Sequence, residues 1–376
     1  MNIVKLADVA HRANTKEDRF NTDKIYYVGG EHIESEELII RHKGIIKGST
    51  IGPMFYYGFK AGQILFVTRN PHLKKCGVAE FDGICSEKTL VIETKDNNIL
   101  LQEYLALVMQ SDDFWNYCEE NKSGGVNYFL NWSTLADYEF TLPPLPEQKV
   151  LAEKLWAAYR LKVAYKKLLA ATDEMVKAKF VEMFGEITEK VSLSSLCNTF
   201  IDGDWIEAKD QAESGIRLIQ TGNVGIGIYK DKGDKARYIS EETFARLNCT
   251  EIYEGDILIS RLPDPVGRAC ILPQGIGKSI TAVDCTIIRL NDKVLPQYII
   301  AFTNTYDYAM QVKKFLSGTT RLRISRNNLG KIQVPLPPKD LQNKFTTIAE
   351  QAEASKTALQ KSIESIDSVI KSLINK

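Results

Sequence analysis

The sequence predicts an α+β protein of two similar domains, each followed by a long helix, with the two helices paired as an antiparallel coiled coil about a pseudo-two-fold axis. An internal repeat carries most of this prediction, because Leu142-Pro143-Pro144 returns 194 positions later as Leu336-Pro337-Pro338. This period is far longer than the roughly 20–50 residues of a solenoid unit. A long segment free of glycine follows each Pro-Pro turn and indicates a helix in both places.

The repeat extends well beyond the prolines and therefore describes whole domains. Ser123-Gly124 falls on Ser317-Gly318 at the same offset. Farther upstream, Gly62-Gln63-Ile64-Leu65 matches Gly255-Asp256-Ile257-Leu258 at an offset shorter by one residue. The resulting boundaries are a first domain at 1–144, a central helix at 145–186, a second domain at 187–336 and a C-terminal helix at 337–376.

Each domain is expected to hold short strands rich in β-branched residues, then helices, then a last strand that leads into the Pro-Pro turn. The predicted strands of the first domain are Ile64–Val67, Leu90–Ile92 and Tyr138–Leu142, with a helix at Leu101–Tyr117. The predicted strands of the second domain are Ile257–Ile259, Thr286–Ile288 and Ile332–Leu336, with helices at Pro296–Thr303 and Tyr308–Leu316.

The C-terminal helix carries an apolar seam, since its apolar positions alternate three and four residues apart over about four heptads. A helix with one apolar stripe needs a partner, and the central helix offers a looser stripe. Each helix has about 38 residues and spans roughly 57 Å at 1.5 Å per residue. The seam positions are Phe345, Ile348, Ala352, Ser355, Leu359, Ile363, Ile366, Ile370 and Leu373, facing Leu151, Leu155, Ala158, Tyr165 and Leu169.

Composition excludes several classes of protein. The chain has 376 residues, of which 44% are hydrophobic and 26% charged, as in a globular protein. No apolar run reaches the ~18 residues of a membrane span, and the first residues do not resemble a secretion signal. The seven cysteines are scattered without a Cys-x-x-Cys pair, which argues against zinc and favours reduced thiols. We therefore expect a cytoplasmic protein with no membrane partner.

Two similar domains on a rigid helical spacer suit a ligand that repeats at a fixed distance. Duplex DNA is the leading candidate, because proteins with two-fold symmetry read half-sites set by helical-turn geometry. Lys+Arg and Asp+Glu both total 48, so the formal net charge is zero. Positive charge for DNA must then be confined to part of the surface.

Several motifs resemble the specificity (S) subunits of Type I restriction–modification systems. The resemblance covers nearly the whole chain and reproduces the order domain, helix, domain, helix. The second turn departs from the pattern, since Asp340-Leu341-Gln342 replaces Pro-Glu-Gln. The motifs are Leu142–Gln148, Pro335–Pro338 with Gln342, Phe180–Gly185, Ile219–Asn223 and Gly255–Arg261.

The resemblance implies two target-recognition domains that each read half of a bipartite, asymmetric sequence in double-stranded DNA. The long helices would act as a ruler and as the docking surface for two methyltransferase M subunits, with restriction R subunits joining them. The chain itself would be non-catalytic and hold no cofactor. S-adenosylmethionine, ATP and Mg²⁺ would belong to the partner subunits.

A basic loop of the second domain is the first candidate contact with DNA. Arg321, Arg323 and Arg326 follow Ser317-Gly318 and could clamp phosphates or read guanine edges. The alternative is a solvated charged loop. The matching stretch of the first domain offers Asn127 and Tyr128 instead, which suits base reading or stacking.

Loops near the start of each domain supply further candidates. Thr221 and Asn223 align with Gly30 and His32, and asparagine suits adenine while histidine suits guanine or phosphate. Such residues are more often turn formers. Basic runs give four more candidates for phosphate contacts, with solvated hairpins as the alternative: Lys230, Lys232, Arg41 and Lys43.

Two rival functions remain. Asp82 with Glu93 and Lys95 imitates the carboxylate and Glu-x-Lys arrangement of Mg²⁺-dependent nucleases, although the second domain has no equivalent. A pure coiled-coil scaffold for other proteins is the other rival. Gly275–Ser279 does not complete a phosphate-binding loop, because Leu272 occupies the position of the required first glycine.

Overall fold

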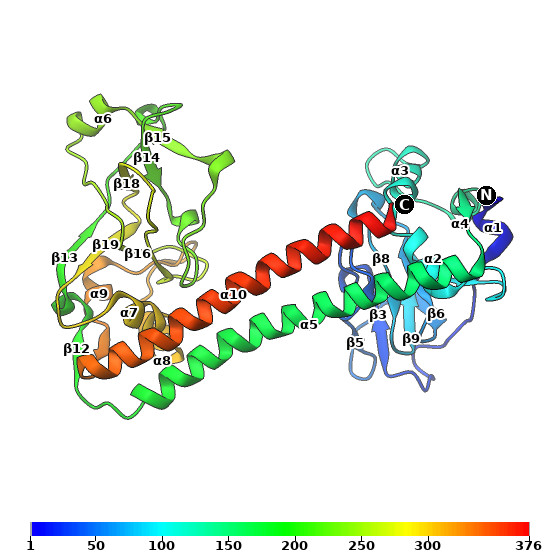
Figure 1. The fold of residues 1–376 in the computed structure, drawn as a ribbon, viewed down its shortest axis with the longest axis horizontal. Coiled ribbons are helices and arrows are strands. Elements are labelled where there is room, and N and C mark those ends of the chain that lie inside the picture. The colour runs from blue at the N-terminus through cyan, green and yellow to red at the C-terminus, as the bar shows by residue number, and fades with distance from the viewer. Residues whose placement is uncertain (1, 376) are drawn as a thin grey trace. The chain divides into compact units, whose positions relative to one another are not determined.

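The computed structural model describes residues 2–375 and consists of two compact units (Figure 1). Unit 1 comprises Met1–Lys167 with Gln360–Lys376, and unit 2 comprises Leu168–Leu359. Each unit contains one mixed α/β domain together with one part of each long helix, α5 (Leu145–Phe184) and α10 (Lys339–Ile374). The α+β class and the duplicated domain-and-helix order are thus confirmed.

Unit 1 is built on three sheets. A two-stranded sheet pairs β1 (Asn2–Lys5) with β11 (Glu139–Leu142). The five-stranded sheet has the order β2 (Ala10–Ala13), β10 (Thr89–Thr94), β7 (Ile64–Val67), β8 (Cys76–Ala79) and β4 (Ile39–Ile40). The four-stranded sheet has the order β5 (Gly44–Ile45), β3 (Tyr26–Val28), β9 (Gly83–Ser86) and β6 (Phe55–Phe59). The helices are α1 (Leu6–Val9), α2 (Gln102–Val108), α3 (Asp112–Glu120) and α4 (Trp132–Ala136), with 3-10 turns η1 (Gly30–His32) and η2 (Pro71–Leu73).

The central strand β7 separates two cores, which explains why its sequence is uniformly apolar. Side chains alternate along a strand, so Ile64 and Phe66 enter the core beneath the helices, while Leu65 and Val67 enter a smaller core on the other face. All four residues are buried. A strand covered on both faces has no polar alternation.

Unit 2 repeats this plan. A two-stranded sheet pairs β12 (Lys190–Ser192) with β20 (Gln333–Pro335). A four-stranded sheet has the order β13 (Cys197–Asp202), β19 (Cys285–Leu290), β16 (Ile257–Ser260) and β17 (Ala269–Ile271). A three-stranded sheet has the order β15 (Arg237–Ile239), β14 (Ile216–Ile219) and β18 (Ser279–Thr281). The helices are α6 (Glu241–Arg246), α7 (Pro296–Thr303), α8 (Tyr306–Lys314) and α9 (Arg326–Gly330). Short 3-10 turns are η3 (Leu193–Leu196), η4 (Ala208–Asp210), η5 (Thr221–Asn223) and η6 (Gly233–Lys235). The parallel pair β14–β18 corresponds to the parallel pair β3–β9 of unit 1.

One predicted helix is wrong in extent. The segment Leu101–Tyr117 was expected to be continuous, but it forms α2 and α3 with a break at Met109–Ser111. Ser111 causes the restart, because its hydroxyl accepts a hydrogen bond from the backbone N–H of Phe114 at 3.1 Å and caps α3.

The repeated glutamine after each Pro-Pro turn has a structural role. Gln148 is fully buried, and its Oε1 accepts from the N–H of Leu101 at 3.0 Å. Its Nε2 donates to the carbonyls of Ile99 and Pro143 at 2.9 and 2.8 Å. Gln342 makes the same three bonds in unit 2, to Leu295, Lys293 and Pro337, at 2.9, 3.0 and 2.9 Å. The motif therefore joins the start of each long helix to the segment that precedes α2 or α7.

The long helices run antiparallel within each unit. In unit 1, Lys162 Nζ lies 2.6 Å from Asp367 Oδ1. In unit 2, Lys356 Nζ lies 2.8 Å from Asp173 Oδ1, and the Phe345 ring packs 5.5 Å from that of Phe184. The predicted seam of α10 is confirmed at its buried positions Phe345, Ala352 and Ile363, whereas the predicted seam residue Ser355 is exposed.

The buried face of α5 differs from the predicted stripe. Leu155 is buried as expected, whereas Leu151, Ala158, Tyr165 and Leu169 are only half-buried. Besides Gln148, the other buried residues of α5 are Ala152, Tyr159, Phe180 and Phe184, because the helix packs on the domains as well as on α10.

All seven cysteines are free, and six of them are buried. Within residues 2–375, none of the helices combines the length and the hydropathy that crossing a membrane would require.

Candidate nucleic-acid interface

A short hairpin after α3 stands at the end of strand β7 in unit 1. Ser123 and Phe129 exchange two backbone hydrogen bonds of 2.9 Å, which close the hairpin. The N–H of Leu130 donates to the carbonyl of Thr68 at 2.9 Å and fixes the hairpin to the loop after β7. Gly124 has φ +100°, and a Cβ there would lie 2.7 Å from the Asn127 carbonyl oxygen. The tight turn projects Asn127 into solvent.

Unit 2 builds the same hairpin from different side chains. Ser317 and Arg323 exchange two backbone hydrogen bonds of 2.9 Å, and the N–H of Ile324 donates to the carbonyl of Arg261 at 3.2 Å. Gly318 takes φ +105°, as Gly124 does in unit 1. Arg321 at the tip and Arg323 are both exposed. The two hairpins therefore share one backbone frame and present different chemistry.

Arg326 lies at the base of this hairpin and is partly neutralised. It is the first residue of α9, and its Nη1 lies 4.0 Å from Asp202 Oδ2. Arg261 Nε lies 3.3 Å from Asp202 Oδ1, so one carboxylate faces two guanidinium groups. Arg326 therefore shares its carboxylate partner with Arg261.

Two predicted base-reading residues are used inside their own loops. Asn223 is buried, its Oδ1 accepts from the N–H of Gln220 at 3.0 Å, and its Nδ2 donates to the Lys230 carbonyl at 2.9 Å. His32 plays the same part in unit 1, where its Nδ1 accepts from the N–H of Gly29 at 3.0 Å. Both side chains close a 3-10 turn, so the turn-forming alternative applies to Asn223 and His32.

A cation that the sequence analysis missed ties each of these loops to the sheet. Arg268 is buried and donates to the carbonyls of Thr221 at 2.7 Å and Val224 at 2.6 Å. Burial lowers the pKa of Arg268 below its ordinary value. In unit 1, Lys75 occupies the matching place and donates to the Gly30 carbonyl at 2.6 Å. The recurrence of a cation just before β8 and β17 was visible in the repeat.

The remaining predicted cations differ in their surroundings. Lys230 and Lys232 are exposed beside η5, and the half-buried Thr221 uses its carbonyl to accept from Arg268. Arg41 Nη2 donates to the Tyr159 hydroxyl at 2.7 Å. Lys43 Nζ stands 3.8 Å from the ring centre of Tyr26.

Basic and aromatic side chains interleave in a second cluster that the sequence analysis did not single out. Lys16 Nζ lies 4.1 Å from the ring centre of Tyr56 and 4.3 Å from that of Tyr57. The Arg12 guanidinium lies 4.8 Å from the Tyr57 ring, which places two cations on one aromatic pair. Cations beside aromatic rings are typical of surfaces that bind nucleic acid. The spacing of basic residues between Arg12 and Arg19 was the available signal.

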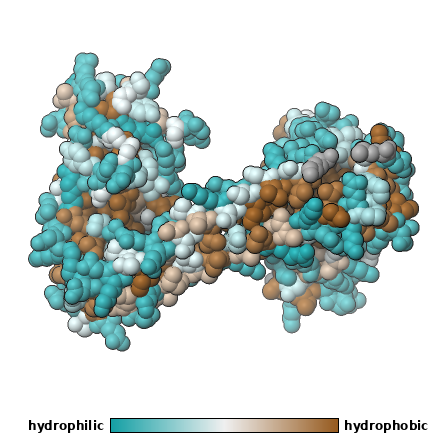
Figure 2. All heavy atoms as spheres, in the orientation of Figure 1, coloured by the Kyte–Doolittle hydropathy of each residue, from teal (hydrophilic) through white to brown (hydrophobic). Residues whose placement is uncertain are grey.

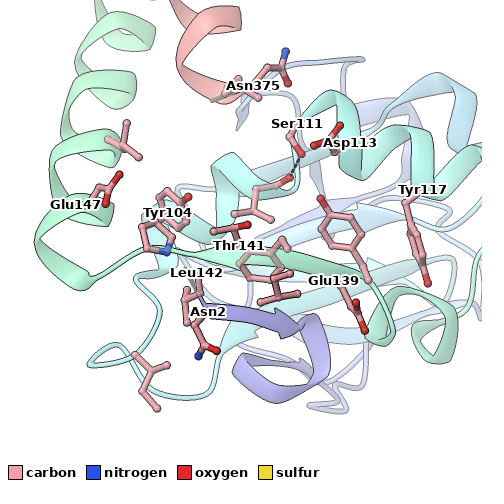
Figure 3. A pocket seen from close by; sticks show the side chains of 18 of the residues that line it. Asn2, Tyr104, Ser111, Asp113, Tyr117, Glu139, Thr141, Leu142, Glu147 and Asn375 are labelled. Carbon is pink, nitrogen blue, oxygen red and sulfur yellow. Dashed lines mark hydrogen bonds between the residues drawn. The ribbon is translucent and has the colours of Figure 1, made fainter.

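One groove of unit 1 has the wrong charge for DNA. It measures about 1450 Å³ and lies among β1, β11, α3, the start of α5 and the end of α10 (Figure 3). Its lining contains five carboxylate residues and no lysine or arginine, so phosphate would be repelled. The acidic residues are Asp113, Glu120, Asp137, Glu139 and Glu147.

The three residues of the nuclease alternative serve other partners. Asp82 Oδ1 accepts from the N–H of Ala61 at 3.0 Å, and Glu93 Oε2 accepts from Gln63 Nε2 at 2.7 Å. Lys95 Nζ donates to the Ala7 carbonyl. Among residues 2–375, no group of three or more His, Cys, Asp or Glu side chains is arranged to hold a metal ion. The arrangement does not favour a nuclease site.

The Type I restriction modification DNA specificity domain family matches residues 1–170 and 186–366, and the chain belongs to this family. The match to both halves agrees with the duplicated hairpins and glutamine motifs described above.

Three known proteins are similar to this chain. The chain is 26% identical over 194 residues to the Type I restriction enzyme EcoDI specificity subunit of Escherichia coli, an alignment that covers 50% of this chain and 42% of that protein. The fold of this chain is similar to a chain of a solved structure of the type I R-M system (TM-score 0.59, 18% identity, covering 99% of this chain and 96% of that chain). It is also similar to the S subunit of a Type I restriction–modification system from M. genitalium (TM-score 0.61, 13% identity, covering 99% and 94%). At these identities the two structures establish the fold.

Proposed function

We propose that this chain is the sequence-specific DNA-recognition subunit of a Type I restriction–modification complex. Each domain reads one half of a bipartite, asymmetric site, and the helices α5 and α10 set the distance between the half-sites. The observation that carries the proposal is the shared hairpin frame with different tips, Asn127 in unit 1 and Arg321 in unit 2. One frame with two sets of side chains suits two different half-sites.

Base reading falls to the exposed hairpin side chains, because Asn223 and His32 are used in turns. Arg321 or Arg323 would form a bidentate pair with guanine, which discriminates by about 1–3 kcal/mol. Asn127 suits adenine, and Tyr128 beside it suits stacking. Lys230, Lys232, Arg41 and Lys43 would contact phosphates and fix the register of each domain on the duplex.

The partners proposed for the chain are methyltransferase M and restriction R subunits. Figure 2 shows hydrophobic residues on unit 1 in the region that α5 crosses. Val150 and Leu161 of α5 are 47% and 44% exposed. Leu168, Met175 and Val181 are exposed on the part of α5 in unit 2. Exposed apolar side chains along one helix support protein docking. The chain itself is non-catalytic in this proposal, and S-adenosylmethionine, ATP and Mg²⁺ are cofactors of the partners.

The test is co-expression with a Type I methyltransferase M subunit, followed by mapping of N6-methyladenine across the host DNA. One bipartite motif with a fixed gap, lost when this chain is deleted, is the expected result. The absence of chain-dependent methylation would refute the proposal.

A double variant tests whether the hairpin of unit 2 reads one half of the methylated DNA motif. Arg321→Gln with Arg323→Gln should relax or change the half of the motif read by unit 2 and leave the other half intact. The matched control is Lys344→Gln, an exposed residue of α10, which should leave both halves unchanged. Changes in both halves, or in neither, would exclude the hairpin as the reading element.

A further inference from the structure

A second groove in unit 1 carries the opposite charge to the one in Figure 3. It measures about 590 Å³ and lies between the edge strand β4, with the turn after β8, and helix α5. Arg41 and Lys43 enter it from the domain, and Arg160 and Lys167 enter it from the helix. We call this groove the basic groove, after these four side chains. Glu80 is the one carboxylate among its lining residues.

The domain side of the basic groove is held in place. Tyr159 of α5 accepts a 2.7 Å hydrogen bond from Arg41 Nη2 and donates its own proton to Glu37. Lys43 Nζ lies 3.8 and 4.1 Å from the ring centres of Tyr26 and Phe81. Both cations are therefore fixed before any ligand arrives, which reduces the entropy lost on binding.

On the helix side of the basic groove, two lysines of α5 form ion pairs within residues 2–375 and the two cations that line the groove do not. Lys162 pairs with Asp367 at 2.6 Å, and Lys166 pairs with Glu37 at 2.9 Å. Arg160 and Lys167 line the groove and form no ion pair within the described part of the chain. They are seven positions apart, so they lie on one helix face at a separation of roughly 10 Å along the axis.

The charge of unit 1 is thus segregated, although the whole chain has no net charge. The lining of the basic groove has four cations and one carboxylate, and Arg41 also lies 3.5 Å from the Glu37 carboxylate behind it. The lining of the groove in Figure 3 has five carboxylates and no lysine or arginine. Phosphodiester groups along a duplex provide the regularly spaced negative charge that such a groove complements.

We propose that the basic groove binds the phosphate backbone of duplex DNA beside the half-site read by unit 1, with Arg160 and Lys167 making two phosphate contacts from the spacer helix. This inference rests on the proposed DNA-recognition function and assigns the spacer helix a direct part in DNA binding. Because phosphate contacts set register, the groove ties the position of the duplex to the helix that carries the domain.

The experiment compares the full-length chain with the double variant Arg160→Gln/Lys167→Gln on a mixed-sequence DNA duplex. Each lost phosphate contact lowers the slope of log K against log[salt] by about 0.9. The double variant should therefore lose about 1.8 from the slope. Between about 50 and 200 mM salt its affinity should fall roughly 12-fold less than that of the wild type.

Two further variants control the experiment. Lys149→Gln/Lys154→Gln removes two exposed lysines of α5 outside the groove lining and should leave the slope unchanged. Arg160→Lys/Lys167→Arg retains the charge and should restore the wild-type slope. Failure of this exchange variant to restore the slope would mean that the first variant acted by disturbing the helix, and would overturn the assignment.

The remaining outcomes are also decisive. An unchanged slope in the double variant, with normal duplex binding by the wild type, overturns the groove assignment and leaves the proposed function standing. A wild-type chain that binds no duplex overturns both. Retained DNA binding with lost binding of a poly-glutamate probe would identify the groove as a site for an acidic protein and refute the phosphate assignment.

Discussion

Replacing Gln342 by methionine keeps the side-chain volume and removes an amide that makes three hydrogen bonds. The residue has no exposed surface, so the N–H of Leu295 and the carbonyls of Lys293 and Pro337 would lose their partner inside the protein. Each buried polar group left unpaired costs about 1–3 kcal/mol. Taking the lower value for each group, we expect a loss of about 3 kcal/mol in the stability of unit 2.

Hydrogen exchange at single amides is the suitable assay, because two compact units need not unfold together. The Leu295 amide should exchange roughly 150-fold faster in Gln342→Met than in the wild type, the equivalent of about 3 kcal/mol. The Leu101 amide, which donates to Gln148 in unit 1, should be unaffected.

The equivalent variant of unit 1, Gln148→Met, should accelerate exchange of the Leu101 amide and leave exchange of the Leu295 amide unchanged. Gln360→Met, at an exposed position of α10, is the control and should change stability by less than about 0.5 kcal/mol. A loss below about 1 kcal/mol in Gln342→Met, or equal acceleration in both units, would refute the reasoning.

Two other predictions concern unit 1 and the hairpin of unit 2. Burial raises the pKa of Glu37, but hydrogen bonds from Tyr159 and Lys166 outweigh it and bring the pKa below its ordinary 4.5. The ionised Glu37 therefore stabilises unit 1 above pH 4.5, and this contribution disappears as the pH falls through the lowered pKa. The free energy of unfolding, measured in urea between about pH 3 and 6, should fall less steeply with decreasing pH in Glu37→Gln than in the wild type. Parallel plots of this free energy against pH would contradict the prediction. Gly318→Ala should cost about 1–3 kcal/mol locally and accelerate exchange of the Ser317 and Arg323 amides, since φ is +105° and the new Cβ would lie 2.4 Å from the Arg321 oxygen. Gly275→Ala, with φ +77° and open space, is the matched control and should leave that hairpin protected.

The sequence predicted those parts of the fold that repeat or that have a strong local pattern. The offset between the Pro-Pro turns brought Gln148 and Gln342 into register, and the structure shows the same three hydrogen bonds at both. Strand β7 was recognisable because both of its faces are buried, which makes the run apolar. The break between α2 and α3 was missed because Ser111 acts through a single side-chain cap within an otherwise helical sequence.

The candidate site was less predictable, because the uses of a polar side chain look alike in sequence. Asn223 and His32 have the chemistry of base readers, yet each accepts a backbone hydrogen bond within its own turn. The basic groove joins Arg41 to Arg160, and no local pattern reports a contact between residues so far apart. Arg268 and Lys75 were recoverable in principle, since the repeat places a cation before the same strand in both halves.

Unit 1 is assembled from two distant parts of the chain, and this has a consequence for biosynthesis. Residues Ile370 and Leu373 of α10 pack against its core, and the Asn375 side chain accepts from the backbone N–H of Asp112 at 2.9 Å. Unit 2 is contiguous, from Leu168 to Leu359, and so can close as soon as it leaves the ribosome. The domain that is translated first therefore keeps the apolar surface under Ile370 and Leu373 uncovered until that part of α10 has been synthesised, and such exposed surface favours aggregation during folding.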